Sequence, residues 1–162
     1  MAAPARAFND SLVHLPHDEM SALVKETAAR RAAVNRQAGH VVIEGADGAF
    51  YVVVREAGNA FKHPGDITVE CFVNIADRAW DGQQTPVTQG HVDLDKDCRL
   101  MEQWTDWTET GAHLWGVTKG VDGKYYVSEN QSLKRTCDAD ICDADAAAAF
   151  KPFFDACASA RF

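Results

Sequence analysis

Residues 91–129 read HVDLDKDCRLMEQWTDWTETGAHLWGVTKGVDGKYYVSE. Runs rich in β-branched and aromatic residues alternate here with turn signals at Asp95–Asp97, Glu109–Gly111 and Asp122–Gly123. An Asp-Gly pair between two such runs is a strong hairpin signal, because a tight primed turn needs positive φ values that Asp and Gly tolerate. The stretch therefore predicts an antiparallel meander that includes a hairpin over Val117–Val127.

Five aromatic residues are the candidate binding residues. If Trp104, Trp115 and Tyr125 share a sheet face, they line a ligand cavity or present a flat patch to a partner, since large aromatic side chains dominate binding energy at such surfaces. The alternative for each ring is a place in the core beneath the helices. Trp107 follows Trp104 by three residues, so the two rings point to opposite faces of a regular strand. Trp80 in a long loop is either a further contact or a plug at the core edge.

The region before the meander predicts a helix and then strands. Apolar residues recur at three- and four-residue spacing within 17–38, and Gly39 stands where a C-terminal cap belongs. The predicted strands after it are His40–Glu44, Ala49–Glu56 and Ile67–Ile75. The second is almost continuously apolar, which predicts that both of its faces are covered. Residues 77–90 are predicted to be irregular.

The C-terminal region predicts an interrupted helix after a polar connection over Asn130–Ile141. Asp143 is suited to cap the alanine-rich run that follows it, with Asp145 in the first turn. Pro152 inside a helix removes a hydrogen bond, so a break is expected near Lys151, with a second short helix after it.

Together these segments predict an α+β fold. We expect a curved antiparallel sheet of about seven strands, with an N-terminal and a C-terminal helix packed on it, both on one face. Residues 1–16 are predicted to be an N-terminal arm, and residues 17–162 a single domain of ordinary size.

The charge of the chain bears on its partners. The net charge is −8 and the pI is about 5.1, which argues against nucleic acid, because phosphate binding needs a basic patch. No run approaches the roughly 20 apolar residues of a membrane span. The N-terminal stretch holds no intact secretory signal, so the chain is either cytoplasmic or an exported protein without its signal.

The five cysteines make an odd number, so at least one is free or pairs between chains. Cys71 and Cys98 fall in predicted strands, as buried free thiols. Cys137, Cys142 and Cys157 cluster near the C-terminus, in and after a repeated Cys-Asp-Ala-Asp. A disulfide from Cys142 to Cys137 or to Cys157 is favoured over a metal site, because no histidine lies nearby.

The run Asp93, Asp95 and Asp97 has the spacing that begins a calcium loop. The sixth and twelfth positions of such a loop need Gly and an acid, but Cys98 and Trp104 stand there. A solvated turn is therefore favoured, and a looser calcium site is the alternative.

No motif predicts catalysis or a cofactor. His91 or His113 could meet a thiol only through folding, and nothing resembles a nucleophile elbow. The sequence favours a non-enzymatic acidic module that docks onto a protein partner, as inhibitors and immunity proteins do. The alternative is a small-ligand-binding protein or cofactor-free enzyme, with a pocket between the sheet and the N-terminal helix. The sequence indicates no particular partner or oligomeric state.

Overall fold

The computed structural model describes residues 12–78 and 84–162. In these parts of the chain the strands are β1 (Leu12–Val13), β2 (Gly39–Glu44), β3 (Phe50–Arg55), β4 (Ile67–Arg78), β5 (Gln84–Leu94), β6 (Thr105–Thr110), β7 (His113–Lys119), β8 (Tyr125–Glu129) and β9 (Ser132–Cys137), and the helices are α2 (His17–Val34) and α3 (Ala144–Ser159). Strands β2 to β9 form one antiparallel sheet in chain order, and β1 pairs with β4 beside this order. The predicted α+β fold is confirmed, with eight consecutive strands rather than about seven.

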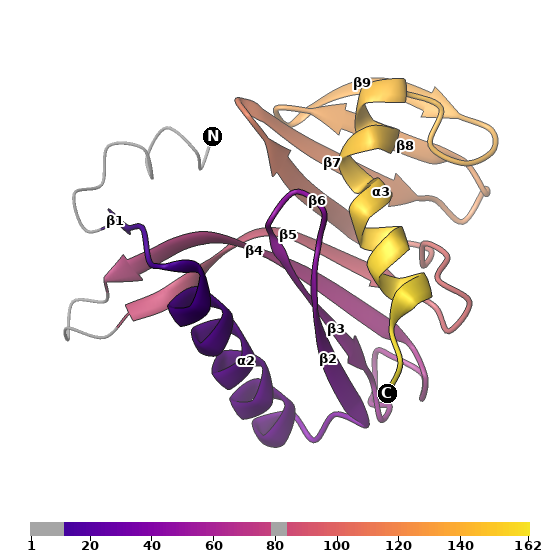
Figure 1. The fold of residues 1–162 in the computed structure, drawn as a ribbon. Coiled ribbons are helices and arrows are strands. Elements are labelled where there is room, and N and C mark those ends of the chain that lie inside the picture. The colour runs from indigo at the N-terminus through magenta and orange to yellow at the C-terminus, as the bar shows by residue number, and fades with distance from the viewer. Residues whose placement is uncertain (1–11, 79–83) are drawn as a thin grey trace.

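The two helices lie on opposite faces of the sheet, and β2 and β3 run between them (Figure 1). Along β3, Phe50, Val52 and Val54 pack against α2, whereas Tyr51 and Val53 pack in the cluster that includes α3. The prediction that β3 is covered on both faces is confirmed. The prediction that both helices share one face is wrong, because the continuously apolar β3 needs a cover on each side.

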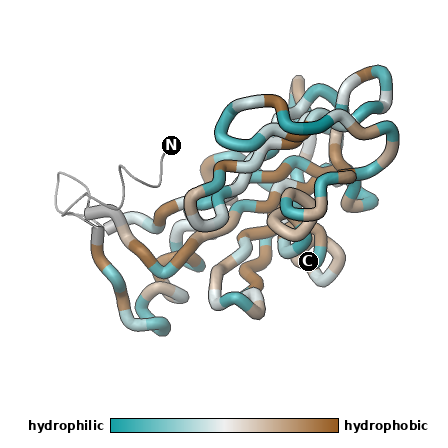
Figure 2. The backbone as a smooth tube through the Cα atoms, turned by 90° about the horizontal axis from the view of Figure 1, so that it is seen from above, coloured by the Kyte–Doolittle hydropathy of each residue, from teal (hydrophilic) through white to brown (hydrophobic). Residues whose placement is uncertain are grey.

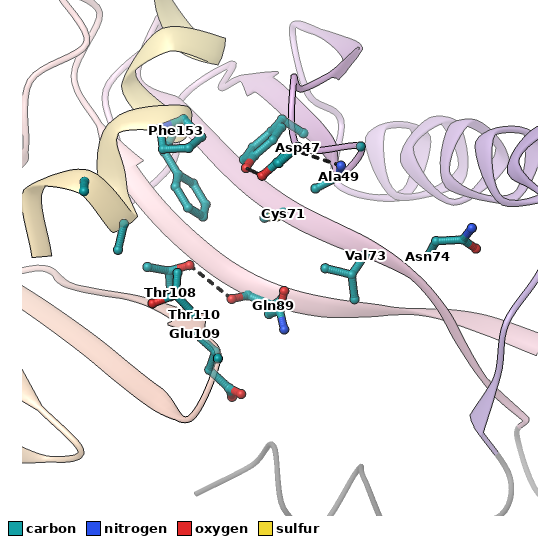
Figure 3. Close-up of a pocket in the computed structure, with 16 residues that line it drawn as sticks. Asp47, Ala49, Cys71, Val73, Asn74, Gln89, Thr108, Glu109, Thr110 and Phe153 are labelled. Carbon is teal, nitrogen blue, oxygen red and sulfur yellow. Dashed lines mark hydrogen bonds between the residues drawn. The ribbon is translucent and has the colours of Figure 1, made fainter. Parts of the chain in front are cut away.

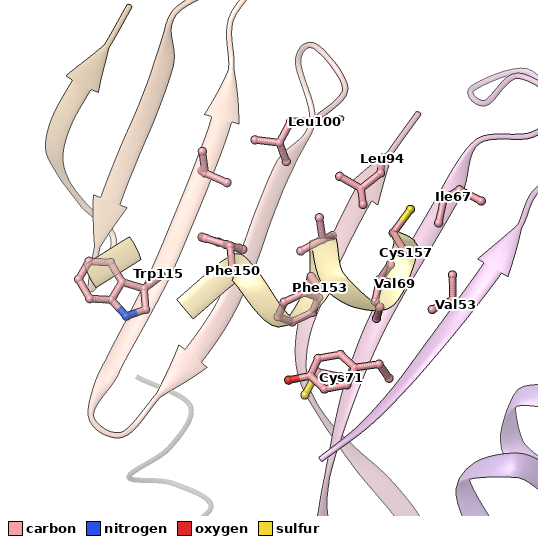
Figure 4. Packing of buried hydrophobic residues seen from close by; sticks show 14 of the residues in the cluster. Val53, Ile67, Val69, Cys71, Leu94, Leu100, Trp115, Phe150, Phe153 and Cys157 are labelled. Carbon is pink, nitrogen blue, oxygen red and sulfur yellow. The ribbon is translucent and has the colours of Figure 1, made fainter. Parts of the chain in front are cut away.

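The cluster under α3 is the larger of the two hydrophobic cores. Phe150 and Phe153 of α3 lie over the sheet beside Val69 and Leu94, and Trp115 lies at the far end (Figure 4). Hydrophobic residues are concentrated on the strands in the middle of the molecule, and many turns at its edge are hydrophilic (Figure 2). Burial of these side chains is the main source of stability, at about 25 cal/mol per Å² of apolar surface.

Helix α2 ends earlier than predicted. Arg36, just after the helix, has a φ of 52°, and the N–H of Gln37 donates to the carbonyl of Ala32 at 3.0 Å. This left-handed residue and backward hydrogen bond form a Schellman-type cap. Gly39 is therefore not the cap; it opens β2.

Helix α3 is continuous through Pro152, so the predicted break is wrong. Asp143 caps the helix as predicted, accepting a hydrogen bond from the N–H of Ala146 at 3.0 Å. Buried side chains lie on both sides of the proline, including Phe150 and Phe153. Their packing offsets the roughly 3 kcal/mol that a proline costs inside a helix.

Two predicted irregular segments contain strands. β4 extends to Arg78 and β5 begins at Gln84, and residues 79–83, which include Trp80, lie outside the described residues. β9 occupies half of the predicted polar connection, and its side chains are exposed except for Cys137, so it lacks an apolar pattern. The predicted hairpin of β7 and β8 is confirmed. Residues 1–11 of the predicted arm also lie outside the described residues.

A narrow seam divides the sheet between β5 and β6. The residue pairs across it are Gly90–Thr108 and His91–Trp107, whereas β4 and β5 pair from Ile67 to Arg78 with two irregularities. Helix α3 contacts strands on both sides of this seam, namely β3 and β4 on one side and β6 and β7 on the other. The sheet therefore consists of two parts that α3 bridges.

Two disulfides hold the ends of α3. Cys137 pairs with Cys142 just before the helix. This pair is one of the two disulfides that the sequence predicted as alternatives for Cys142. Cys98 pairs with Cys157, so the prediction of a free thiol in a strand is wrong for Cys98, which lies in a turn. Cys71 is free and buried, as predicted. In the described part of the chain, no helix is long and apolar enough to span a membrane.

Candidate functional site

A cleft of about 480 Å³ lies between α3 and the sheet at the end of the seam. The turn between β2 and β3, with Asp47 and Ala49, stands across the cleft from Thr108, Glu109 and Thr110 of β6 (Figure 3). Its other lining residues are Gly48, Tyr51, Cys71, Val73, Asn74, Gln89, Gly111, Ala148, Ala149, Pro152 and Phe153.

Small residues of α3 explain why this space is open. Ala148 and Ala149 face it with side chains of one carbon. Pro152 has no N–H, so the carbonyl of Ala148 does not accept the helical hydrogen bond that the residue four positions later normally donates. Gly90 of β5 lets Phe153 approach the sheet closely, because a Cβ at this position would collide with the phenyl ring. The alanine run therefore leaves a hollow beside the helix.

The inner wall of the cleft carries neutral polar groups. The hydroxyl of Tyr51 donates to the carboxylate of Asp47 at 3.0 Å. Burial raises the pKa of Tyr51, and burial raises the pKa of the Cys71 thiol to about 12. Both groups therefore stay protonated at physiological pH, and the thiol is not an activated nucleophile.

Two side chains beside the cleft have no hydrogen-bond partner among the described residues. Glu109 is only 5% exposed and has no hydrogen bond or ion pair within the described residues. Asn74 lies at the edge, apart from the other labelled residues, and its Oδ1 is buried without a hydrogen bond (Figure 3). Glu109 alternates with Thr108 and Thr110 along β6 and pairs with Leu114, so its carboxylate lies on the face of the sheet that carries Trp107 and points away from α3 (Figure 3).

The cleft continues into hollows on either side along α3. One of about 410 Å³ shares Tyr51 and Pro152 with it, and one of about 470 Å³ shares Thr110 and Ala149. We call the three together the α3 groove. The acidic residues along it are Glu44, Asp47, Glu109, Glu129, Asp145 and Asp155, of which Glu109 directs its carboxylate to the other face of the sheet, and the basic residues are Lys151 and His113.

A second polar site, which we call the Asp93 cluster, lies beside the seam. Lys62 Nζ is 2.6 Å from Oδ1 of Asp93 and 2.8 Å from the hydroxyl of Thr68. His91 Nε2 is 3.2 Å from Oδ2 of Asp93. Hydrogen bonding to Asp93 raises the pKa of His91. Burial raises the pKa of Asp93, but the hydrogen bonds and charges of His91 and Lys62 outweigh burial and lower the pKa of Asp93 to about 2.

Asp106 completes the Asp93 cluster and titrates differently. It is 1% exposed and accepts a hydrogen bond from the main-chain N–H of Asp93 at 2.7 Å, in place of strand pairing. Burial raises the pKa of Asp106 to about 7. Two carboxyl groups with separated pKa values are typical of acid–base sites, but these two do not line the α3 groove.

The Asp-x-Asp-x-Asp run does not converge. Asp93 binds Lys62, whereas Asp95 accepts hydrogen bonds from the N–H groups of Asp97 and Arg99, so the predicted turn is confirmed. Within the described residues, no group of three His, Cys, Asp or Glu side chains is placed to hold a metal ion.

The predicted aromatic group is brought together only in part. Trp115 is 3% exposed and Tyr125 packs against the same core, on the face of α3. Trp104 lies in the loop before β6, with Lys62 Nζ at 5.3 Å from the ring centroid. Trp107, which pairs with Gly116, alternates with Asp106 and Thr108 and faces away from α3. Trp80 lies outside the described residues.

The space under α2 is nearly filled. A hollow of about 50 Å³ remains between Ala28 and Phe72, which is too small for a ligand. The pocket that the sequence places beneath the N-terminal helix is therefore found beside the C-terminal helix instead.

Comparison with protein-family models, with curated proteins and with solved structures found no match for this chain. The function therefore has to be inferred from the site itself.

Of the residues that line the α3 groove, the sequence pointed to Trp115 as a binding residue and to His113 and Cys71 as a possible pair, but it did not indicate that they border a common groove. The available signal was the alanine run before Pro152, since a helix of small side chains leaves space beside it. Glu109 was assigned to a turn, and no local pattern shows that β6 and the turn at Asp47 meet across a cleft.

Proposed function

We propose that this protein is a non-enzymatic binding module that docks onto a basic segment of a protein partner through the α3 groove. The observation that carries the proposal is the groove's charge: the carboxylates of Glu44, Asp47, Glu129, Asp145 and Asp155 line it, against Lys151 and His113. The net charge of −8 adds a long-range attraction for a basic partner. Complementary charge of this kind steers association and selects partners.

A binding role is favoured over catalysis by the state of the cleft's thiol. Burial raises the pKa of the Cys71 thiol to about 12, and no histidine is among the residues that line the cleft with it. A nucleophilic cysteine needs the opposite, a lowered pKa and an adjacent base.

Site-specific photo-crosslinking tests the proposal. A photoreactive amino acid at Ala148, in the groove, is compared with one at Ala29, an exposed alanine on α2. In extract from the protein's source, we expect a crosslinked partner at Ala148 and none at Ala29, with the crosslink mapped by mass spectrometry to a basic segment. Loss of the crosslink at high salt supports the electrostatic part. Equal capture at both positions, or capture of an acidic segment, contradicts the proposal.

A small-ligand-binding protein is the second candidate, because about 480 Å³ is in the usual range for ligand pockets. Native mass spectrometry of protein purified from its source distinguishes the two. A stoichiometric small mass that Ala148→Trp displaces favours the ligand, and its absence together with the Ala148 crosslink favours the partner.

A further inference from the structure

We propose that β2 is a dimer interface, where it pairs in antiparallel fashion with β2 of a second copy of this chain about a two-fold axis at Val42. β2 stands at one end of the sheet order, and β3 is its one neighbour among the described strands. It runs between the two helices (Figure 1). The inference concerns this edge of the sheet and is independent of the docking function proposed above.

The pairing of β2 with β3 determines which main-chain groups of β2 point to the open edge. The N–H of Gly45 donates to the carbonyl of Ala49 at 2.8 Å, and this bond fixes the alternation of hydrogen-bonded pairs along the register. Every second residue of β2 therefore bonds β3, and the N–H and C=O groups of His40, Val42 and Glu44 point away from it. Antiparallel pairing about Val42 satisfies all three residues in both copies, with about six hydrogen bonds.

The apolar side chains of β2 are complementary to themselves in this register. Val42 meets Val42 of the second copy on the axis, and Val41 meets Ile43 on either side of it. All three are half-buried; Val42 packs in the cluster under α2, and Val41 and Ile43 pack against the cluster under α3. Opposite residues of an antiparallel pair share a face, so pairing continues both apolar layers across the axis.

The polar residues toward the ends of β2 also match. His40 meets Glu44 of the second copy, and the same pair recurs on the other side of the axis. Glu44 bonds His17 of its own chain through Oε1, which leaves Oε2 for the second copy. Any other register separates His40 from Glu44, so the register centred on Val42 is favoured.

The other edge of the sheet is protected against pairing, whereas β2 is not. β9 carries Lys134 and Arg135, and its pairing with β8 is irregular between Val127 and Ser128. Charged side chains and bulges are common devices that keep an edge strand from pairing. β2 contains no Lys, Arg or Pro and pairs with β3 without a shift in register.

Sedimentation velocity tests the dimer. The mass is expected to rise from 17.7 kDa toward twice that value as the concentration increases. The Kd is expected to be on the order of 10–100 µM, because one strand pair buries less than the roughly 1,200 Å² of stable complexes. Val42→Pro removes an N–H that β3 does not use, so this variant is expected to keep the fold, as checked by circular dichroism, and to stay monomeric.

Charge variants test the same pairing at exposed positions, where folding is not at risk. His40→Glu places carboxylates opposite each other, and Glu44→Lys places basic side chains opposite each other, so each is expected to weaken the dimer about tenfold. An equimolar mixture of the two variants is expected to restore it, because each introduced charge then faces a side chain of opposite character. Leu133→Glu on the exposed edge β9 is the control that leaves the Kd unchanged.

NMR of a mixture of isotope-labelled and unlabelled chains tests the register. An intermolecular NOE is expected between the Hα atoms of Val41 and Ile43, because they form a closely spaced pair without hydrogen bonds. A single-chain mass at the highest concentration overturns the inference. A dimer that lacks this NOE, or one that the Val42 and charge variants leave unchanged, also overturns it, because the interface then lies elsewhere.

Discussion

At the scale of single residues, Asp106 makes stability depend on pH near neutrality. Its pKa is about 7 in the folded protein and 3.8 for an ordinary aspartate, so between these values the folded state keeps a proton that the unfolded state has lost. Stability therefore falls as pH rises from about 4 to 7, by at most about 1.4 kcal/mol per unit. Asp106→Asn is expected to flatten this fall and to raise the urea midpoint at pH 8 more than at pH 5.

His91 contributes with the same sign, since its pKa is also raised and its stabilising charge is lost as pH rises above the folded value. A smaller fall is therefore expected to remain in Asp106→Asn. Asp122→Asn, in an exposed turn, serves as the control that leaves the slope of wild type between pH 5 and 8. An unchanged slope in Asp106→Asn contradicts the assignment.

Lys62 is expected to be the most important cation for stability. Its side chain is 15% exposed, and it neutralises Asp93, which is 4% exposed. Lys62→Met leaves that buried carboxylate with the Thr68 hydroxyl and with His91, which is then its one neighbouring basic side chain among the described residues, so the free energy of unfolding is expected to fall by about 3 kcal/mol at pH 7. Chemical denaturation measures this, with Lys25→Met on exposed α2 as the control. A loss below about 1 kcal/mol shows that His91 suffices.

At the scale of elements, Pro152 costs α3 a hydrogen bond that the fold tolerates. Pro152→Ala restores an N–H for the carbonyl of Ala148 and removes the clash of the ring, so a gain of about 1–2 kcal/mol is expected after the lost ring contacts. Thermal unfolding measures this gain. Lower stability in the variant shows instead that packing of the ring in the groove outweighs the helix bond.

Element types were more predictable than their ends and partners. The pattern of β3 predicted its coverage, and Asp122-Gly123 predicted the hairpin, because both signals are local. The break predicted at Pro152 was wrong, since Phe150 and Phe153 pack against strands from far along the chain. This packing outweighs the local cost of the proline. β9 was missed because an exposed edge strand needs no apolar alternation.

At the scale of the whole molecule, the two disulfides are expected to contribute unequally. Cys98 and Cys157 are separated by 59 residues and Cys137 and Cys142 by 5. Loop entropy predicts a loss of about 4 kcal/mol for the double Ala variant of the first pair and about 2 kcal/mol for the second. Urea denaturation without reductant compares the two variants. Equal losses contradict this entropic account.

The α3 groove lay beyond what the sequence could predict, because it exists only where distant segments meet. Asp47 and Glu109 stand 62 positions apart in the chain, and no periodicity relates them. The acidic charge was visible, but not its collection beside one helix. Of the aromatic residues that the sequence singled out, Trp115 lies in the core and also borders the α3 groove, whereas Trp104 packs beside Lys62.

The short join between β5 and β6 has a mechanical consequence. With strand pairing reduced to two positions, bending of the sheet concentrates there, and α3 acts as a splint across it. A partner side chain bound in the cleft beside that join would resist this bending. Binding there would therefore reduce the motion of the two parts of the sheet relative to each other.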